Sequence, residues 1–498
     1  MQSNSAAHRS PRWLSPKGLL FRFAAVLLGI SPLLLAEIGL RAFDFGRLNE
    51  IEDPYVGFSS VRPLFVLNGA SQRYEIAPSR LALFYPDSFP AEKDKGEFRV
   101  FCLGGSTVQG SPYTIETSFT TWLELSLRAA DPSRNWRVVN CGGLSYASYR
   151  LVPILNEVLA HEADLIIVYT GQNEFLEDRS YNEVKRISPL VARVHAACSN
   201  WRCYNLCRLA WIHSCRRISP SAAGNRTIMP ADVDAWLDHP GGLNAYHSND
   251  DWRRGVVEHY GRNLQRMVDC SLQAGVPLVF CNPVCNLKDC PPFKSEPSGE
   301  LSVENRMRLD KKWSEARNLT NDRLARRAQL VREVLAIDDR FAAAHFLLGR
   351  CHLDEGRIAE AKNEFVRAKD EDICPLRMIE PMYEVLAQVA RRNRVPLVDV
   401  RALIEDRTPD HIPGQEWLMD HVHPTISGHQ LIAESLFHQM DQMGLVHASP
   451  EWQQQRDAAF REHLAKLDTP YFLRAKERLD GQRRWTEGRA FKQHTPDR

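Results

Sequence analysis

Five short, continuously apolar runs divide the chain and predict buried β-strands. They are Phe98–Leu103, Trp136–Asn140, Asp164–Tyr169, Val276–Cys281 and Val395–Val400. None alternates between apolar and polar positions, which is typical of strands buried on both faces of a parallel sheet. Helix-like stretches lie between them, such as Ser118–Ala130 and Tyr149–His161. The pattern therefore predicts a doubly wound α/β fold, in which ligands bind beyond the carboxyl ends of the strands.

The N-terminal segment has the pattern of a membrane anchor. Basic residues precede an apolar stretch, and a usable span from Gly18 to Leu40 approaches the ~20 residues that a bilayer requires, provided that Arg22 snorkels. A cleaved signal peptide is the alternative, but Leu34 stands where the cleavage site needs a small residue. We therefore expect an uncleaved, single-pass transmembrane helix in the inner membrane, with the catalytic part of the chain extracytoplasmic (periplasmic).

Two inserts interrupt the strand–helix pattern. Residues 184–251 are rich in cysteine and show no clear period. Residues 301–375 contain small and apolar positions at the spacing of a tetratricopeptide repeat, namely Leu348, Gly349, Gly356, Ala361, Phe365 and Ala368. Small residues let two helices pack closely, and Gly356 suits the turn between them. This α-helical insert is interpreted either as a structural extension or as a surface for a protein partner.

Net charge and cysteine content limit the classes of ligand and partner that we expect for this chain. The 498 residues carry a formal net charge of +1, so no global charge favours nucleic acid as a partner. Of the twelve cysteines, Cys198, Cys203, Cys207 and Cys215 cluster, and an oxidising compartment would permit disulfides there. Their spacing matches no zinc template, and we expect neither a metal nor a cofactor. Other cysteines, such as Cys102 and Cys141, are interpreted as small buried apolar residues.

The stretch FCLGGSTVQG, residues 101–110, places Ser106 at a tight corner after the first strand. Three known glycine motifs do not fit. A phosphate-binding loop lacks its lysine, and a dinucleotide fingerprint lacks its three glycines. The Gly-x-Ser-x-Gly elbow has Val108 in place of its second glycine.

A catalytic interpretation of Ser106 gains support from distant segments. A serine nucleophile needs a histidine base and a carboxylate that orients it, and His423 and Asp420 lie three residues apart in MDHVHPT. A developing oxyanion also needs hydrogen-bond donors. Asn173 follows the third strand, and VVNCGGLSYAS follows the second with exposed backbone amides. All of these segments fall at strand ends, which predicts one site.

These segments resemble the first, third and fifth blocks of the SGNH, or GDSL-like, hydrolases. The matching runs are Gly104-Gly105-Ser106, Gly171-Gln172-Asn173-Glu174 and Asp420-His421-Val422-His423-Pro424. The resemblance implies a three-layer α/β/α sandwich and Ser-His-Asp ester chemistry. It also implies an oxyanion hole formed by the Ser106 amide, Asn173 and a second-block amide. The repeat insert and NPVCNLKDCPPF are similar to membrane-anchored bacterial members that carry tetratricopeptide repeats.

The chain departs from the family pattern in three places. Gly105 replaces the aspartate of the first block, and Glu174 replaces an aspartate of the third. In the second block an ungapped match places Ser145 at the position of the oxyanion glycine, whereas a gapped match uses Gly142 or Gly143. A backbone amide is available from any of the three, so the donor stays open.

Each of the proposed site residues also has a purely structural, non-catalytic interpretation. Ser106 and Asp420 could cap helices, Asn173 could be a turn residue and His423 a surface histidine. Taken together and in order, the catalytic interpretation is favoured. His421 and His429 flank the site and suggest a metal centre with Asp420 and His423, but the triad already accounts for two of those four residues.

The predicted function is that of a serine-dependent acyl-ester hydrolase acting on a carbohydrate- or lipid-linked ester in the cell envelope. One alternative is an O-acyltransferase acting on a polysaccharide, and another is an inactive scaffold that presents the repeat insert. The expected organisation is a cytoplasmic tail and anchor at 1–45, an extracytoplasmic connection at 46–95, the hydrolase core at 96–183, 252–300 and 376–446, the inserts at 184–251 and 301–375, and a charged tail at 447–498.

Overall fold

The computed structural model describes residues 16–42, 60–61, 63–177, 201–204, 206–207, 228–229, 233–320 and 323–488. The chain divides into two compact units. One comprises Met1–Ser60 with Ser180–Met229, and the other comprises Val61–Arg179 with Pro230–Arg498. Cys198 and Cys215 lie outside the described residues, as does most of the predicted insert at 184–251.

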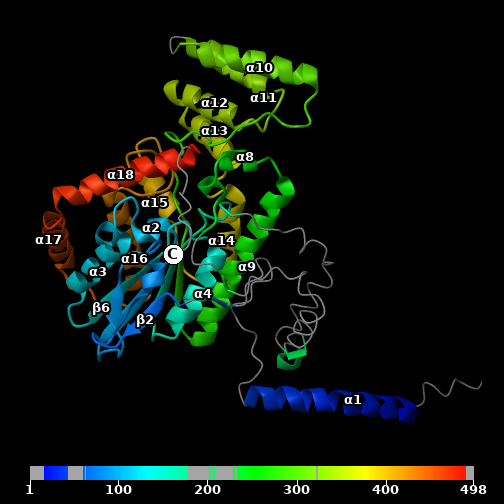
Figure 1. Cartoon of the computed structure of the whole chain (residues 1–498), viewed down its shortest axis with the longest axis vertical. Coiled ribbons are helices and arrows are strands. Elements are labelled where there is room, and N and C mark those ends of the chain that lie inside the picture. Colours follow the sequence, from blue (N-terminus) through cyan, green and yellow to red (C-terminus); the bar gives the residue numbers. More distant parts are fainter. Residues whose placement is uncertain are drawn as a thin grey trace, which may run out of the picture. The chain divides into compact units, whose positions relative to one another are not determined.

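The first unit contains helix α1, Pro16–Ala42 (Figure 1), on which the predicted anchor falls. Within the described part of the chain, no helix has both the length and the apolar character that crossing a membrane requires.

The second unit is built on a five-stranded parallel sheet, as the apolar runs predict. Its strands are β5 (Glu97–Gly104), β6 (Asn135–Gly142), β7 (Leu165–Tyr169), β9 (Leu278–Cys281) and β10 (Leu397–Val398). They lie in the order β10-β9-β7-β5-β6, and every neighbouring pair is parallel. Gly104 at the end of β5 pairs with Gly142 and Tyr169, so the carboxyl ends of three strands meet at one edge.

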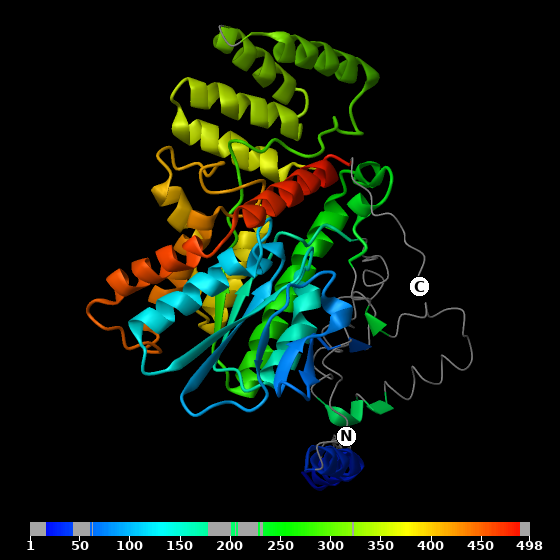
Figure 2. The ribbon, with the colours of Figure 1, turned by 60° about the vertical axis from the view of Figure 1, so that its left-hand side comes forward.

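Helices cover both faces of the sheet (Figures 1 and 2). On one side α3 (Phe119–Ala130) packs against α16 (Ile426–Gln442) and α17 (Trp452–Ala465). Their apolar residues join Val100 and Cys102 of β5 in one buried cluster. On the other side α4 (Ser148–Leu159) packs against α9 (Asp250–Ala274), which also contacts α14 (Glu380–Asn393). The sheet is therefore a buried middle layer, which explains its continuous apolar runs.

A small antiparallel sheet precedes the core, within the predicted connecting segment at 46–95. It consists of β2 (Phe65–Asn68), β3 (Arg73–Ile76) and β4 (Ser88–Pro90), in the order β2-β3-β4. Phe65 and Phe89 have ring centroids 5.0 Å apart, and both also contact Phe101 of β5. This aromatic cluster attaches the small sheet to the core.

The predicted helical insert contains α10 (Val303–Asn318), α11 (Leu324–Leu335), α12 (Ala342–Asp354) and α13 (Ile358–Asp370), and consecutive helices pack together. Gly356 lies in the α12–α13 turn with a φ of 74°, as the sequence predicts. A Cβ atom on Gly349 would lie 2.9 Å from the ring of Phe365, so the missing side chain permits the close packing. Membership of the tetratricopeptide-repeat family stays a prediction.

The remaining elements are short or lie near the chain's C-terminal end. They are β1 (Ser60–Val61), β8 (Ile228–Met229), α2 (Ser106–Gln109), α8 (Gly242–Ala245), α15 (Val400–Arg407), α18 (Thr469–Thr486) and the 3₁₀ turns η2 (Pro78–Arg80), η3 (Ile115–Thr117) and η4 (Trp236–Asp238).

Candidate active site

The corner at Ser106 is shaped by two glycines that tolerate no side chain. Strand β5 ends at Gly104, and Ser106 is the first residue of the short helix α2. A Cβ atom on Gly104 would lie 2.3 Å from the backbone oxygen of Tyr169, and one on Gly105 would lie 2.4 Å from Nδ2 of Asn173. The chain can therefore turn sharply and hold Ser106 at the carboxyl edge of the sheet, where it is 7% exposed.

The segment that carries Asp420 and His423 folds back on itself before helix α16. The Thr425 hydroxyl caps this helix by accepting the Gly428 amide, and Met419 N–H donates to the His423 carbonyl oxygen at 2.7 Å. Oδ1 of Asp420 accepts the backbone amides of Val422 and His423, both at 2.9 Å. These bonds fix the carboxylate relative to the imidazole.

The structure brings Ser106, His423 and Asp420 into one hydrogen-bonded row. Nδ1 of His423 lies 2.7 Å from Oδ2 of Asp420, and Nε2 lies 2.7 Å from Oγ of Ser106, across 317 residues of sequence. An ionised carboxylate only accepts, so Nδ1 carries the proton and Nε2 of the neutral ring accepts from the serine hydroxyl. The arrangement can take a proton from Ser106 as its oxygen attacks.

Asp420 remains ionised although it is buried. Burial is the largest single influence and would raise its pKa. Electrostatic attraction to His423 and His421, together with the hydrogen bonds from His423 and the Val422 amide, lowers the pKa by more. The net effect holds the pKa of Asp420 well below its usual range. An ionised Asp420 can keep the imidazole in the required tautomer and stabilise it when it becomes charged.

Gly142, Gly143 and Ser145 are the three candidates for the second-block oxyanion donor, and they differ in what their backbone amides bond to. Gly142 N–H donates to Oδ1 of Asn140 at 2.9 Å, and Gly143 N–H donates to the Gly104 oxygen at 3.0 Å. Ser145 N–H has no acceptor among the described residues, and Ser145 has a φ of 62°. A left-handed conformation is strained for a non-glycine residue and often marks a functional position. Ser145 is therefore the candidate whose amide is free for a ligand.

Asn173 lies against the serine corner, where its carboxamide packs on Gly105. Nδ2 donates to the Tyr146 oxygen at 3.1 Å, which engages one of its two hydrogens and fixes the plane of the amide. The neighbouring Glu174 is fully buried, and its carboxylate accepts the backbone amide and the hydroxyl of Ser148. The Glu174 bonds thus tie the Asn173 segment to the start of helix α4.

The flanking histidines have contacts of their own. Nδ1 of His429 accepts the Phe119 amide at 3.2 Å, which joins α16 to α3. His421 lies 3.6 Å from the Asp420 carboxylate, and its ring meets that of Phe293 edge to face at 5.1 Å. No group of three or more His, Cys, Asp or Glu side chains suited to a metal ion occurs in the described part of the chain.

Acidification is expected to destabilise the fold through these two histidines. Burial lowers the pKa of His421 to about 4 and that of His429 to about 3. In the unfolded chain each pKa returns to about 6.5. Between these values the unfolded chain binds more protons, so the free energy of unfolding falls as pH drops below 6.5, by on the order of 1–2 kcal/mol per histidine at pH 5. Denaturant titrations at pH 7 and pH 5 measure this loss.

A His429→Gln variant provides the check on that stability loss. It removes one titrating ring, so the difference in unfolding free energy between pH 7 and pH 5 should shrink relative to the parent chain. An unchanged difference would show that His429 does not carry the effect.

The C-terminal helix α18, Thr469–Thr486, lies in the predicted charged tail and also borders the site, a contact that the sequence analysis did not include. Arg478 Nε donates to the Pro112 oxygen at 2.6 Å, and Arg483 Nη2 donates to the Met419 oxygen at 3.3 Å. Pro112 follows the serine corner and Met419 precedes Asp420, so α18 links the two halves of the site. Its buried residues Tyr471, Ala475 and Leu479, spaced by four, are the signal that could have revealed a packed helix.

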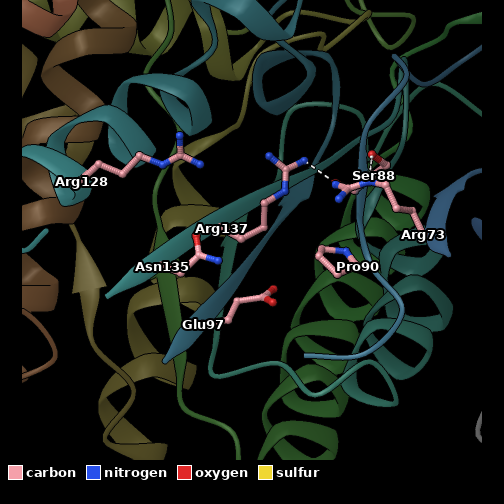
Figure 3. Close-up of a pocket in the computed structure, with 7 residues that line it drawn as sticks. All are labelled: Arg73, Ser88, Pro90, Glu97, Arg128, Asn135 and Arg137. Atoms are coloured by element: carbon pink, nitrogen blue, oxygen red, sulfur yellow. Dashed lines mark hydrogen bonds between the residues drawn. The ribbon is translucent and has the colours of Figure 1, made fainter. Parts of the chain in front are cut away.

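A separate cavity of about 400 Å³ lies at the opposite edge of the sheet (Figure 3). Its lining residues are Arg73, Ser88, Pro90, Glu97, Arg128, Asn135 and Arg137. Glu97 and Asn135 are the first residues of β5 and β6, whereas Ser106 follows the end of β5. The cavity is therefore distinct from the row that contains Ser106.

Comparisons with known proteins concern the overall fold. No family model and no curated protein matches the chain. Among solved structures it is similar to a lipase/acylhydrolase from Enterococcus faecalis (11% identity, 70% of this chain, 96% of that chain, TM-score 0.30). It is also similar to a GDSL-like lipase from Bacteroides thetaiotaomicron (9% identity, 69% of this chain, 88% of that chain, TM-score 0.28). A third similar structure is an α/β hydrolase from a lake metagenome (14% identity, 71% of this chain, 97% of that chain, TM-score 0.31). The function proposed below rests on this chain's own residues.

Proposed function

We propose that the chain is a serine-dependent acyl-ester hydrolase with Ser106 as nucleophile, His423 as general base and Asp420 as the group that orients it. The observation that carries this proposal is the row of two 2.7 Å hydrogen bonds from Ser106 through His423 to Asp420. Serine hydroxyls are weak nucleophiles unless a base lies within hydrogen-bond reach. His423 meets this requirement, and it is 4% exposed, so water competes little for its Nε2.

In the first step Ser106 Oγ attacks the carbonyl carbon of the ester. Nε2 of His423 takes the hydroxyl proton, and the imidazolium that forms is stabilised by the ionised Asp420. The tetrahedral intermediate then collapses, and His423 returns the proton to the departing alkoxide. The products of this step are an alcohol and an acyl-Ser106 ester.

The negative charge of the intermediate needs preorganised donors. We assign this role to the amide of Ser106, which has no intrahelical acceptor at the start of α2, to the free amide of Ser145 and to the second N–H of Asn173 Nδ2. The bond from Nδ2 to Tyr146 holds the carboxamide in place before substrate arrives. The donors therefore need no reorganisation as charge develops.

In the second step His423 takes a proton from water as it attacks the acyl-serine, then returns that proton to Ser106 Oγ when the ester bond breaks and the carboxylic acid leaves. If a carbohydrate hydroxyl takes the place of water, the same residues perform O-acyl transfer, which is the alternative within the same chemistry. An inactive scaffold is disfavoured because its role would not require a buried serine and a buried histidine that are hydrogen-bonded to each other. Product analysis with and without a sugar acceptor separates hydrolysis from transfer.

Replacing Asn173 by alanine is expected to lower kcat by about 10²- to 10³-fold, the typical effect of losing one oxyanion donor. KM should change little, because the donor is strongest once charge has developed. Steady-state kinetics on a nitrophenyl ester measure both constants. A kcat within threefold of the parent would remove Asn173 from the oxyanion hole.

The Gly105→Ala substitution tests the same donor without deleting it. The new methyl group would meet Nδ2 of Asn173 at 2.4 Å and push the carboxamide away. We expect a kcat loss of about tenfold or more, since a donor displaced by a fraction of an ångström stabilises the oxyanion less. Gly69→Ala is the matched control, because a methyl group on Gly69 would meet nothing within 4 Å. Equal activity of the two variants would contradict the assignment.

We further propose that the enzyme acts in the cell envelope, anchored to the inner membrane by its N-terminal segment. The support is the basic stretch followed by apolar residues from Gly18 to Leu40. Labelling of membrane and soluble cell fractions with a fluorophosphonate, followed by peptide mapping, tests nucleophile and location together. Ser106 modified in the membrane fraction is the expected result. Modification confined to the soluble fraction would overturn the location, and no modification of Ser106 would overturn the activity.

A further inference from the structure

The loop after strand β9, residues 282–295, holds the Asp420–His423 segment from outside the site. Asn286, 4% exposed, donates its backbone amide to the His421 oxygen at 2.9 Å. Its Nδ2 donates to the Asp420 oxygen at 3.3 Å, and its Oδ1 accepts the Asp289 amide at 2.9 Å. One asparagine thus donates to two successive backbone carbonyl oxygens, those of Asp420 and His421.

Arg377 connects this loop to the end of the helical insert. Its Nη1 donates to the oxygens of Asn286 and Cys290, at 2.9 and 2.7 Å. Its Nη2 lies 3.5 Å from Oδ2 of Asp372, and both side chains are almost fully buried. Asp372 also accepts the amides of Phe293 and Lys294. Because Asp372 lies two residues after helix α13, this ion pair joins the insert to the loop that holds Asp420.

Buried apolar side chains make the same connection independently. One cluster contains Ala361 and Phe365 of helix α13, Cys285 and Leu287 of the loop, Ile412, and Val422 of the Asp420–His423 segment. Val422 lies between Asp420 and His423 in the sequence and is 3% exposed. The insert therefore packs into the cluster that holds the residue between the proposed base and its carboxylate.

We propose that Asn286 and Arg377 are positioning residues that hold Asp420 and His423 in line with Ser106, and that the helical insert sets the geometry of the site through them. The catalytic consequence rests on the proposed function. The physical reason is that proton transfer from Ser106 to His423 depends on keeping the two 2.7 Å hydrogen bonds of this row. A shift of about 1 Å in a catalytic group can cost on the order of 10²-fold in rate. The bond to the Asp420 oxygen comes from the Asn286 side chain, whereas the bond to His421 comes from its backbone amide, so removing the side chain releases the peptide at Asp420 and allows it to shift.

The closing experiment compares Asn286→Ala with Asn282→Ala. Asn282 is a matched control because it is 7% exposed, lies four residues earlier in the loop and also makes two side-chain hydrogen bonds. Its partners are Asp399 and the Arg401 amide, away from the catalytic segment. We expect Asn286→Ala to lower kcat 10- to 100-fold with KM within twofold, and Asn282→Ala to keep kcat within twofold. Equal kcat values in the two variants would overturn the proposal.

Arg377→Lys tests the second positioning residue while keeping a cation beside Asp372, so that the buried carboxylate is not left unpaired. A lysine ammonium has a shorter reach and no fork, and it should keep one of the two carbonyl bonds at most. We expect kcat to fall between those of the parent and Asn286→Ala. A kcat equal to that of the parent would remove Arg377 from the positioning role.

A spectroscopic readout separates this inference from the proposed function. The Nδ1 proton of His423, hydrogen-bonded to Asp420, should give a far-downfield ¹H resonance, identified by its absence in His423→Gln. Asn286→Ala should shift or broaden this resonance, and Asn282→Ala should leave it unchanged. An inactive parent chain with this response would overturn the esterase proposal alone. An active parent chain whose resonance is the same in both variants would overturn the positioning role alone.

Discussion

Ser106→Ala is expected to lower kcat for ester hydrolysis by about 10⁴-fold or more, to the level that binding and the oxyanion donors alone support. The substitution removes the only atom that can form the acyl-enzyme bond while leaving the amide of residue 106 in place. Substrate binding should therefore persist, with a KM or inhibition constant close to that of the parent. Steady-state kinetics with a short-chain nitrophenyl ester measure the loss.

The control for Ser106→Ala is a buried serine of another kind. Ser126 lies in helix α3, is 1% exposed and donates its hydroxyl to the Trp122 oxygen within the same helix. Ser126→Ala should keep kcat within about twofold of the parent and cost about 1 kcal/mol of stability at most. Hydrolysis by Ser106→Ala at the parental rate, with both variants folded by circular dichroism, would rule out Ser106 as nucleophile.

Asp420→Asn should lower kcat by about 10⁴-fold with little change in fold. The reason lies in the two oxygens of this side chain. An asparagine oxygen can still accept the Val422 and His423 amides, which Oδ1 of Asp420 accepts at 2.9 Å. Its amide nitrogen then faces Nδ1 of His423 and donates to it, which forces the proton onto Nε2. A ring with Nε2 protonated cannot take the proton of Ser106.

The pH dependence of the Asp420→Asn variant provides a second measurement. Without the carboxylate, the imidazolium that forms during the reaction loses its main stabilisation, so kcat/KM of the variant should stay far below that of the parent at every pH at which the fold is stable. Thermal unfolding should show a native-like transition. A kcat within tenfold of the parent would mean that another group orients His423 and that Asp420 serves as a loop cap.

The sheet is predictable because its strands carry a strong local signal. Each is buried on both faces, so apolar character runs through the whole strand, as in LIIVY of β7. The small sheet β2–β4 gave no such signal. Its strands have three or four residues and mix apolar with polar or charged positions, as in FVLN of β2 and RYEI of β3. They are stabilised by the aromatic contacts of Phe65 and Phe89 with the core. Tertiary packing of this kind leaves no period in the sequence.

The residues of the site likewise divide into those that a local sequence motif indicates and those that only the folded structure reveals. Ser106, Asn173, Asp420 and His423 can be proposed from the sequence because each follows a strand or precedes a helix in a recognisable local motif. The choice of Ser145 over Gly142 and Gly143 required the backbone bonds, since the sequence offers an amide at all three positions. Asn286 and Arg377 carry no local signal. Asn286 is 134 residues from Asp420 and Arg377 is 91 residues from Asn286, so only the folded chain relates them.

The distance along the chain between Ser106 and His423 has a consequence for biosynthesis. The two are 317 residues apart, and at 5–20 residues per second a ribosome needs roughly 15–60 s to pass from one codon to the other. During that interval the nascent polypeptide already contains Ser106 but lacks His423, the proposed base. Under the proposed mechanism, ester hydrolysis therefore requires translation to pass residue 423, so a product released before that residue lacks the proposed base and should not cleave esters.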